Sequence, residues 1–339
     1  MPRQQSLWPS ALGAAAGLAG GLGIDAVLGD PRRGHPVAAF GNVAAAAERA
    51  VHRDSRPVGA AYAGTLTGGA AGLGLLASRA ARGRPAAAVL TAAATWMVLG
   101  GTTLRREAHA MHRLLAAGDL EGARERLPHL CGRDPSQLDL DGLARATVES
   151  VAENTSDAVV APLLWGAVAG VPGLLAYRAA NTLDAMVGHR SARHERFGWA
   201  SARTDDAANL LPARLTAVLA SGLAPVVGGR VRSALRAWYR DGAKHPSPNA
   251  GPVEAAFAGA LGCTLGGRLC YAGQVEDRPL LGDGPAPQID DVLRAARLSA
   301  AVSVAAGALA VSTRLALDLV RTRRASDVAG MRRGGWSGR

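Results

Sequence analysis

Three acidic residues recur at helical spacing in the middle of the chain, at Glu149, Glu153 and Asp157. Residues four apart lie on one face of a helix, so these carboxylates would repel one another unless a cation lay between them. Carboxylate oxygens are the ligands that Mg²⁺ prefers beside phosphate groups. The spacing therefore predicts a metal site, and the alternative is a solvated acidic helix face.

A second acidic group consists of Asp205 and Asp206, with Asn209 one helical turn after Asp205. Two adjacent aspartates followed by an asparagine resemble the Mg²⁺–diphosphate sites of other enzymes. We therefore predict Asp205 and Asp206 as further metal ligands. The alternative interpretation is an acidic cap at the N-terminus of the helix that follows.

Two other polar groups adjoin apolar runs. Asn181 and Asp184 are neighbours at i and i+3 on a predicted helix, where polar packing between helices is the alternative to a binding role. Asp30 and His35 stand in the run GDPRRGHPV (29–37), in which two prolines and two glycines favour a rigid turn over a helix. Such a turn can hold both side chains toward one point, or it can simply end the preceding helix.

The only lysine of the chain is Lys244, in the run DGAKHPSPNAG (241–251). Its prolines and glycines exclude regular structure, so a shaped loop is predicted. The other permanently positive side chains are arginines. One retained lysine indicates a requirement for a compact ammonium, such as a contact with a phosphate, unless its retention is accidental.

The composition excludes several classes of protein. Hydrophobic residues make up 48% of the 339 residues and charged residues 19%, which excludes a disordered chain. No lysine stands in a phosphate-binding G-x-x-x-x-G-K-[ST] motif, and the three cysteines form no zinc spacing. The net charge of +11 is spread between apolar stretches and aromatic residues are only 4%, so a membrane surface is favoured over nucleic acid.

Apolar runs of membrane length organise the chain, since a helix needs about 20 apolar residues to cross the hydrocarbon core. Four such runs contain no charged residue and no histidine: 4–24, 57–78, 85–104 and 158–177. Two weaker runs are 215–229 and 298–313, and no β alternation is sustained. We predict an all-α, polytopic integral membrane protein with four to six spans joined by polar helices and loops. A single helical membrane domain over 1–320 would carry the active site, and the Arg-rich tail over 321–339 would be disordered.

The run 158–177 raises a conflict of topology. If it crossed the membrane completely, Asp157 and Asp184 would lie on opposite sides and could not serve one site. Irregular backbone is permitted at membrane depth where it lines a protein cavity. We therefore expect a re-entrant segment that is broken at Pro162 and Pro172.

Five motifs together resemble a known family. They are GDPRRGHPV, VESVAENTSD, NTLDAMVGH, FGWASARTDDAANLLPARLTA and KHPSPNAGPVEAAFAGALG. Their order and spacing, from about Gly23 to Gly282, resemble the CobD/CbiB family of cobalamin biosynthesis, the membrane-bound adenosylcobinamide-phosphate synthases. Two positions depart from the family pattern: Ala158 replaces a glycine, and Pro135 replaces a threonine. Neither departure removes a candidate charged side chain.

The resemblance implies an ATP-dependent ligase that forms a carbon–nitrogen bond. The carboxylate of adenosylcobyric acid, a corrinoid, would be joined to the amine of (R)-1-aminopropan-2-yl phosphate or of ethanolamine phosphate. The product would be adenosylcobinamide phosphate, and ATP with Mg²⁺ would activate the carboxylate. Other membrane-associated enzymes of late cobalamin synthesis are candidate partners, and no nucleic acid is expected.

The resemblance and the residue types together yield role assignments, which are hypotheses. Six residues are assigned to catalysis: Asp30, His35, Glu153, Asp157, Lys244 and His245. Eight are assigned to binding of ATP and phosphates: Asn154, Asn181, Asp184, Arg203, Asn209, Arg214, Ser247 and Asn249. Five are assigned to the metal: Glu149, Glu153, Asp157, Asp205 and Asp206. Either His35 or His245 could accept the proton of the amine, because the base must work near neutral pH.

The family also implies a multi-pass protein of the cytoplasmic membrane with its active site on the cytoplasmic side. The rival hypothesis is a non-enzymatic membrane protein, either a transporter or a scaffold for the corrinoid pathway. Broken helices with polar ends would suit a transporter. A transporter would also need polar groups in the middle of its spans, where the four uncharged runs offer almost none.

Overall fold

The protein is almost entirely helical in this computed structural model, which describes residues 8–30, 35–189, 191–271 and 274–334. The helices are α1 (Trp8–Leu28), α2 (Pro36–Val51), α3 (Arg56–Ala80), α4 (Arg84–Val98), α5 (Gly101–Ala116), α6 (Leu120–Arg126), α7 (Leu140–Thr155), α8 (Ala161–Leu183), α9 (Trp199–Gly222), α10 (Val231–Asp241), α11 (Ala250–Leu261) and α12 (Ile289–Gly334). The short turns are η1 (Leu127–His129), η2 (Ser156–Val160), η3 (Asp184–Gly188), η4 (Ala224–Val227) and η5 (Gly242–Lys244), and the strands are β1 (Leu265–Tyr271) and β2 (Gln274–Leu281).

The predicted all-α membrane fold is confirmed. Within the described part of the chain, three helical segments are long and apolar enough to cross a membrane: Arg84–Ala116, Leu140–Gly188 and Ile289–Val320. The apolar helix Gly13–Leu28 is shorter. The predicted number of four to six spans stays a prediction.

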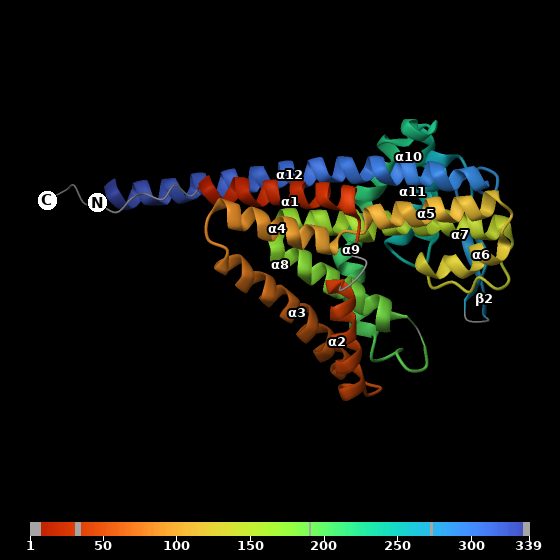
Figure 1. Ribbon diagram of the computed structural model, residues 1–339, viewed down its shortest axis with the longest axis horizontal. Helices are drawn as coiled ribbons and strands as arrows, with labels where there is room; N and C mark the ends of the chain where they lie inside the picture. The colour runs from red at the N-terminus through yellow and green to blue at the C-terminus, as the bar shows by residue number, and fades with distance from the viewer. Residues whose placement is uncertain (1–7, 31–34, 190, 272–273, 335–339) are drawn as a thin grey trace.

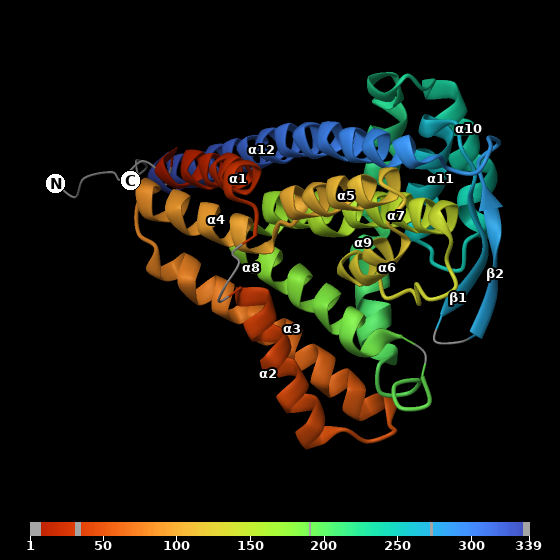
Figure 2. The same ribbon diagram turned by 45° about the vertical axis from the view of Figure 1, so that its right-hand side comes forward.

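Along the longest axis, α1 and α4 lie toward one end, and α5, α6, α7, α10 and β2 lie toward the other (Figures 1 and 2). We call the first the apolar end, because α1 and α4 each contain a single charged residue, and the second the polar end, because α5, α6 and α10 are rich in charged residues. At the apolar end, α1 packs along α4 and along the long helix α12. Gly13, Gly17 and Gly21 recur at four-residue spacing on α1, and a side chain at any of them would collide with α4. Small residues at this spacing let membrane helices approach closely, which explains the abundance of glycine and alanine.

The polar end carries α5, α6, α7, α10, α11 and the two strands (Figure 2). The strands form an antiparallel hairpin whose base is the pair Leu265–Leu281, and both of these leucines are buried. The hairpin is an exception to the predicted absence of strands. Gly266 and Gly267 both have positive φ and introduce an irregularity next to the base, so the hairpin lacks a regular alternation in sequence.

The C-terminal helix α12 differs from expectation in its length. The sequence predicts a disordered tail from residue 321, whereas α12 continues to Gly334. Residues 335–339 lie outside the described residues. The division of the chain into a domain and a tail stays a prediction.

Candidate active site

Four of the five motifs meet in one small acidic pocket between α7, α8, α9 and α11. Its volume is 90 Å³. Five carboxylates line it, from Glu153, Asp157, Asp184, Asp205 and Asp206. Polar side chains complete the lining: Ser156, Asn209, Ser247 and Asn249. Residues more than 90 positions apart in the chain are thereby brought to one point, and we call this cavity the acidic pocket.

A reversal inside α8 brings the two ends of an apolar run to this pocket. Gly170 has φ 67° and ψ −151°, and the chain turns back there, just before Pro172. Gly173 then lies so close to the backbone of Trp165 that a side chain would not fit. Residues 158–169 extend only about 18 Å as a helix, well short of the ~30 Å hydrocarbon core. The expected break lies at Gly170 next to Pro172, whereas Pro162 lies in the first turn of α8 and does not break it. The re-entrant course of this segment in the membrane stays a prediction.

Two π-helical turns carry pocket carboxylates. The turn η2 contains Asp157, and the turn η3 begins with Asp184. A π turn adds a residue to the helical repeat and thereby redirects the side chains near it, and such turns are frequent at functional sites. The turn η2 also contacts the start of α5, because the N-cap residue Gly100 donates its N–H to the carbonyl of Ala158 at 3.1 Å.

Hydrogen bonds fix Asp205 within the acidic pocket. Asn209 Nδ2 donates to Asp205 Oδ2 at 2.9 Å, and Asn181 Nδ2 donates to Asp205 Oδ1 at 3.3 Å. The Tyr177 hydroxyl lies 2.9 Å from Asn209 Oδ1 and so orients that amide. Burial, together with the negative charge of Asp184, raises the pKa of the Asp205 carboxyl to about 7.

The donor set of the acidic pocket fits Mg²⁺. Its polar atoms are mainly carboxylate oxygens, with amide and hydroxyl oxygens beside them, and hard cations of this kind prefer such ligands. Arg203 Nη1 lies 3.3 Å from Asp206 Oδ2 at the exposed edge and offsets one charge. The remaining carboxylates crowd a space that could hold little more than one or two ions, so bulky substrates would have to bind beside it.

The loop before α11 closes one wall of the acidic pocket. Ser247 Oγ accepts hydrogen bonds from the backbone N–H groups of Asn249 and Ala250 and thereby caps the start of α11. Asn249 Nδ2 donates to the carbonyl of Asp206 at 2.8 Å, and Asn249 Oδ1 accepts from Arg214 Nη1 at 3.0 Å. Arg214 thus supports the wall through Asn249, which a sequence reading could not show.

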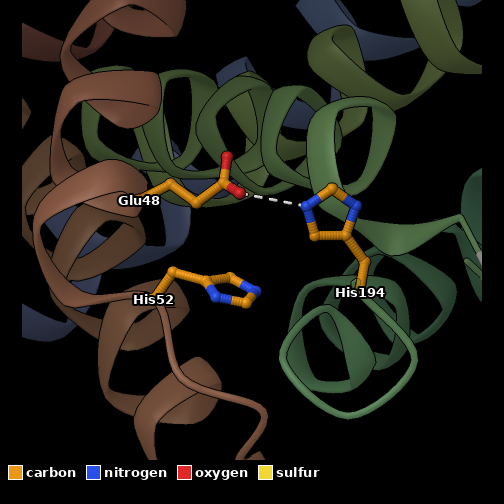
Figure 3. A group of neighbouring side chains, drawn as sticks. All are labelled: Glu48, His52 and His194. Atoms are coloured by element: carbon orange, nitrogen blue, oxygen red, sulfur yellow. Dashed lines mark hydrogen bonds and ion pairs between the residues drawn. The ribbon is translucent and has the colours of Figure 1, made fainter. Parts of the chain in front are cut away.

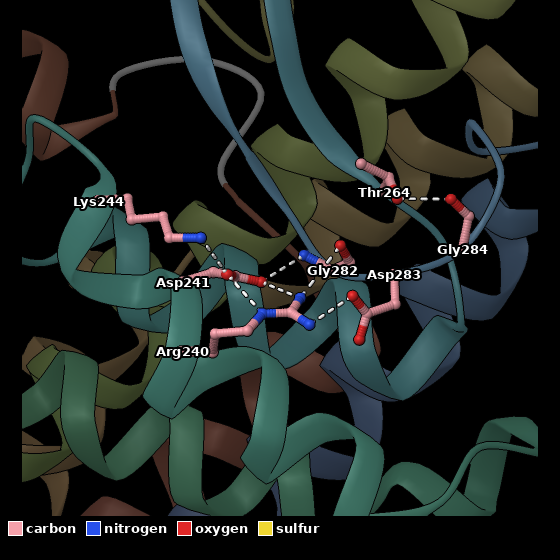
Figure 4. A network of polar contacts seen from close by, with 7 residues as sticks. All are labelled: Arg240, Asp241, Lys244, Thr264, Gly282, Asp283 and Gly284. Carbon is pink, nitrogen blue, oxygen red and sulfur yellow. Dashed lines mark hydrogen bonds and ion pairs between the residues drawn. The ribbon is translucent and has the colours of Figure 1, made fainter.

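Lys244 lies at the start of the same loop, outside the pocket lining. Its Nζ lies 2.8 Å from Asp241 Oδ1 (Figure 4). Arg240 donates twice to the same carboxylate, at 2.8 and 2.6 Å, and Gly282 N donates at 2.9 Å. Hydrogen bonds from Arg240 and Lys244 hold the pKa of Asp241 well below its usual range. Asp241 thereby ties α10 to the end of β2.

His245 is buried rather than open to a substrate. Its Nδ1 accepts from Ser247 N at 3.0 Å, while its Nε2 lies 3.2 Å from Arg278 Nη1 and 3.8 Å from Glu254 Oε1. Burial raises the pKa of Glu254, and the nearby Glu149 carboxylate acts in the same direction. The predicted role of His245 as a base stays a prediction, and its contacts indicate a place in a buried charge network.

Glu149 and Asn154, both assigned from the sequence, also lie outside the lining of the acidic pocket. Glu149, assigned to the metal, is buried, with Oε2 2.6 Å from Arg133 and Oε1 accepting from Gly266 N at 2.7 Å. The ion pair with Arg133 already compensates the charge of Glu149. The position of Glu149 therefore differs from the expectation that it lies beside Glu153 and Asp157 as a metal ligand. Asn154, assigned to ATP binding, donates back to the carbonyl of Ser150 at 2.9 Å.

Asp30 and His35 border a separate, larger cavity of 920 Å³ beside α5. Residues 31–34, which connect them, lie outside the described residues. Several cations of this cavity were not candidates from the sequence, among them Arg106 and Arg113. Only the fold reveals them, because neither stands in one of the five motifs. Tyr177 was missed too, although a tyrosine near the end of an uncharged run is a signal that could have found it.

A further group of side chains joins the end of α2 to the chain before α9. Glu48 and His194 face each other, with the ring of His52 beside them (Figure 3). Arg193 and His194 both donate to Glu48 Oε1, at 3.0 Å for the shortest pairs. Burial opposes ionisation of Glu48, but these hydrogen bonds outweigh it and lower its pKa. Because an arginine already satisfies the carboxylate, we interpret the group as an ion-pair cluster.

Comparisons with known proteins agree with the motifs. Residues 18–299 match the family described as CobD/Cbib protein. The chain is similar to "Cobalamin biosynthesis protein CobD" of Mycobacterium tuberculosis, with 55% identity over 298 residues that cover 88% of this chain and 95% of that protein. A protein of the same name from Chromobacterium violaceum is 44% identical over 281 residues, which cover 81% of this chain and 88% of that protein. No solved structure matches the chain.

Proposed function

The chain belongs to the CobD/Cbib family, and on this premise we propose that it is an adenosylcobinamide-phosphate synthase. The family places it in cobalamin biosynthesis as a membrane protein. The proposed reaction joins the carboxylate of adenosylcobyric acid to the amine of (R)-1-aminopropan-2-yl phosphate or of ethanolamine phosphate. The proposed location is the cytoplasmic membrane, with the active site on the cytoplasmic side.

The proposed chemistry proceeds in two steps. A carboxylate is a poor electrophile, so its oxygen first attacks the γ-phosphorus of ATP, which yields an acyl phosphate and ADP. The amine then attacks the acyl carbon, loses a proton to a base, and expels inorganic phosphate as the amide forms. Bound Mg²⁺ would supply neutralisation of the phosphate charge that develops in the first step.

The single observation that carries the proposal is the convergence of four motifs on the acidic pocket. Glu153, Asp157, Asp205 and Asp206 would hold the metal, because they are the carboxylates that the fold gathers there together with Asp184. Asn181 and Asn209 would orient Asp205 through their hydrogen bonds. These residues would fix the ion before the substrates arrive, so that no reorganisation is needed during the reaction.

The test is amide formation by the purified protein in detergent or nanodiscs. The reaction contains adenosylcobyric acid, aminopropanol phosphate, ATP and Mg²⁺, and mass spectrometry follows adenosylcobinamide phosphate and ADP together. We expect equal amounts of both products and none when ATP or Mg²⁺ is omitted. A protein that folds and binds a corrinoid but forms no amide would overturn the ligase proposal in favour of a transporter or scaffold.

A further inference from the structure

The large cavity beside α5 combines cations with a carboxylate that lacks a partner. Asp30 and Thr103, in the first turn of α5, both line this cavity, and Asp30 N donates to Thr103 Oγ1 at 3.2 Å. Asp30 Oδ1 is buried and has no hydrogen-bond partner among the described residues. Leaving such an oxygen unpaired costs about 1–3 kcal/mol, so a donor from a ligand would be favoured there.

Three basic side chains of this cavity stand on one side of α5. Arg106, His109 and Arg113 are exposed, and all three line the cavity. The negative charge of Glu107 is offset by Arg126, whose Nε lies 2.9 Å from Glu107 Oε2. The three α5 side chains have no carboxylate partner among the described residues, so the cavity favours an anion.

Arg106 is held in place beside Asp30. Its Nη1 donates to the carbonyl of Leu28 at 2.9 Å, which positions the guanidinium without neutralising it. Gly29, with φ 68°, lies against this guanidinium so closely that a side chain could not be added. A guanidinium held by a backbone carbonyl therefore lines the same cavity as the unpaired carboxylate oxygen of Asp30.

We propose that this cavity binds a small aminoalkyl phosphomonoester, with its ammonium on Asp30 and its phosphate on Arg106 and His109. Such a ligand carries one positive and one negative end, which complement the Asp30 carboxylate and the Arg106 guanidinium that line the same cavity. Charge-assisted hydrogen bonds at both ends would select this ligand over a plain phosphate or a plain amine. The inference rests on the proposed function, because it assigns that reaction's amine substrate to a site.

The position of the cavity suits delivery of the amine to the acidic pocket. Gly100 N donates to the carbonyl of Ala158 at 3.1 Å, and a Cβ built at Gly100 would lie 4.0 Å from Asp30 Oδ2. Ala158 directly follows Asp157, which lines the acidic pocket. Gly100 therefore lies next to both Asp30 of the large cavity and η2 of the acidic pocket. Of the 920 Å³, the small ligand would fill only a part, which leaves room for a second substrate.

Calorimetry on the intact protein without ATP provides the test, because it measures binding and not turnover. The ligands are aminopropan-2-yl phosphate, propan-2-yl phosphate without the amine, and aminopropan-2-ol without the phosphate. We expect the complete ligand to bind at least about tenfold more tightly than either fragment. In Asp30→Asn the preference over the amine-free ligand should disappear, and in Arg106→Gln the preference over the phosphate-free ligand should disappear.

The controls separate this site from general effects. Arg232→Gln removes an exposed arginine of α10 and should leave all three affinities unchanged. Arg106→Lys keeps the charge and provides a second variant if Arg106→Gln does not fold. Equal affinities of wild type, Asp30→Asn and Arg106→Gln would overturn the proposal, as would displacement of the ligand by ATP in a manner that depends on Arg106. Failure of amide formation with normal binding would instead reject only the proposed function.

Discussion

The hydroxyl of Tyr177 lies 3.1 Å from the backbone carbonyl oxygen of Asp157, although these residues stand at opposite ends of one uncharged run. A straight helix over this run would separate them by about 30 Å. The contact exists because the chain reverses at Gly170. The geometry of the acidic pocket therefore depends on the reversal at Gly170, although Gly170 itself does not line the pocket.

Gly170→Ala should destabilise the protein and lower its activity together. The combination of φ 67° and ψ −151° is essentially restricted to glycine, and strain of this kind costs about 1–3 kcal/mol. Thermal unfolding in detergent should show a lower midpoint for the variant. Gly72→Ala in α3, where no atom lies within 4 Å of the new methyl group, is the control and should keep the wild-type midpoint. A normal midpoint for Gly170→Ala would contradict the observed turn.

Removal of single charges from the acidic pocket should abolish amide formation. Glu153→Gln and Asp157→Asn keep the side-chain shape but remove a ligand that Mg²⁺ requires, and we expect at least about a hundredfold loss of rate. Expression and membrane insertion should remain normal. Glu121→Gln, which changes an exposed pair with Arg124, is the control. Wild-type rates of both pocket variants at limiting Mg²⁺ would show that Glu153 and Asp157 have a structural role and do not bind the metal.

Sequence reasoning found most residues of the acidic pocket because they stand in compact motifs. It named Asp157, Asp184 and Asp205, which line one pocket, and it predicted a break in the run between Asp157 and Asp184, since a straight span would have separated them. Asp139 caps the start of α7, where its Oδ1 accepts from Gly142 N at 2.8 Å. Local spacing determines such features, so they can be read without a fold.

The parts that sequence reasoning missed depend on distant contacts. Glu149 has the spacing of a ligand, but Arg133 approaches it from another segment and neutralises it. The cavity beside α5 likewise arises where Asp30 meets Thr103, 73 residues later. Spacing along one helix cannot reveal which of its faces another segment covers.

Gly188→Ala should displace a pocket carboxylate. A methyl group at position 188 would overlap Asp184 Oδ1, so this carboxylate would have to move. A shift of about 1 Å in an active site can cost about a hundredfold in rate. We expect a marked loss of kcat with little change in the thermal midpoint, because Gly188 lies at the end of η3. Gly64→Ala, which meets no atom within 4 Å, should be silent in the same assay.

Metal affinity should depend on pH near neutrality. Asp205 has a pKa of about 7, raised from 3.8 by burial and by Asp184, so it is largely protonated at pH 6 and must release a proton when a metal binds. The apparent Kd for Mg²⁺ should be about tenfold weaker at pH 6 than well above pH 7. The stability of the metal-free fold should follow the opposite trend. Because Asp205 binds its proton more tightly in the native state than in the unfolded chain, it stabilises the native state most below about pH 4, and this contribution is lost as the pH rises to about 7. Calorimetric titrations across this range, with Asp205→Asn as the comparison, should show a steeper dependence on pH in wild type than in the variant.

The function of Lys244 can be separated from its ion pair. Asp241 keeps two hydrogen bonds from Arg240 and one from Gly282 N when Lys244 is replaced, so the carboxylate stays satisfied. The Lys244 side chain is 51% exposed, and ion pairs at such positions contribute about 0–1 kcal/mol. Lys244→Ala and Lys244→Arg should therefore unfold close to the wild-type temperature. A large loss of activity in either variant would then reflect a lost contact with a substrate.

We expect Lys244→Arg to fail nearly as badly as Lys244→Ala, with about a hundredfold loss of kcat/KM. Lys244 begins the loop whose Ser247 and Asn249 line the acidic pocket, so its ammonium can reach a phosphate bound beside that pocket. An arginine keeps the charge but is longer and planar, and a loop bounded by prolines offers little room for adjustment. The measurement is kcat/KM for ATP and for the aminopropanol phosphate separately, because a loss confined to one substrate identifies the phosphate that Lys244 contacts. Near-normal kinetics of Lys244→Arg, in a chain that uses arginine for its other permanent cations, would show that a lysine is not specifically required.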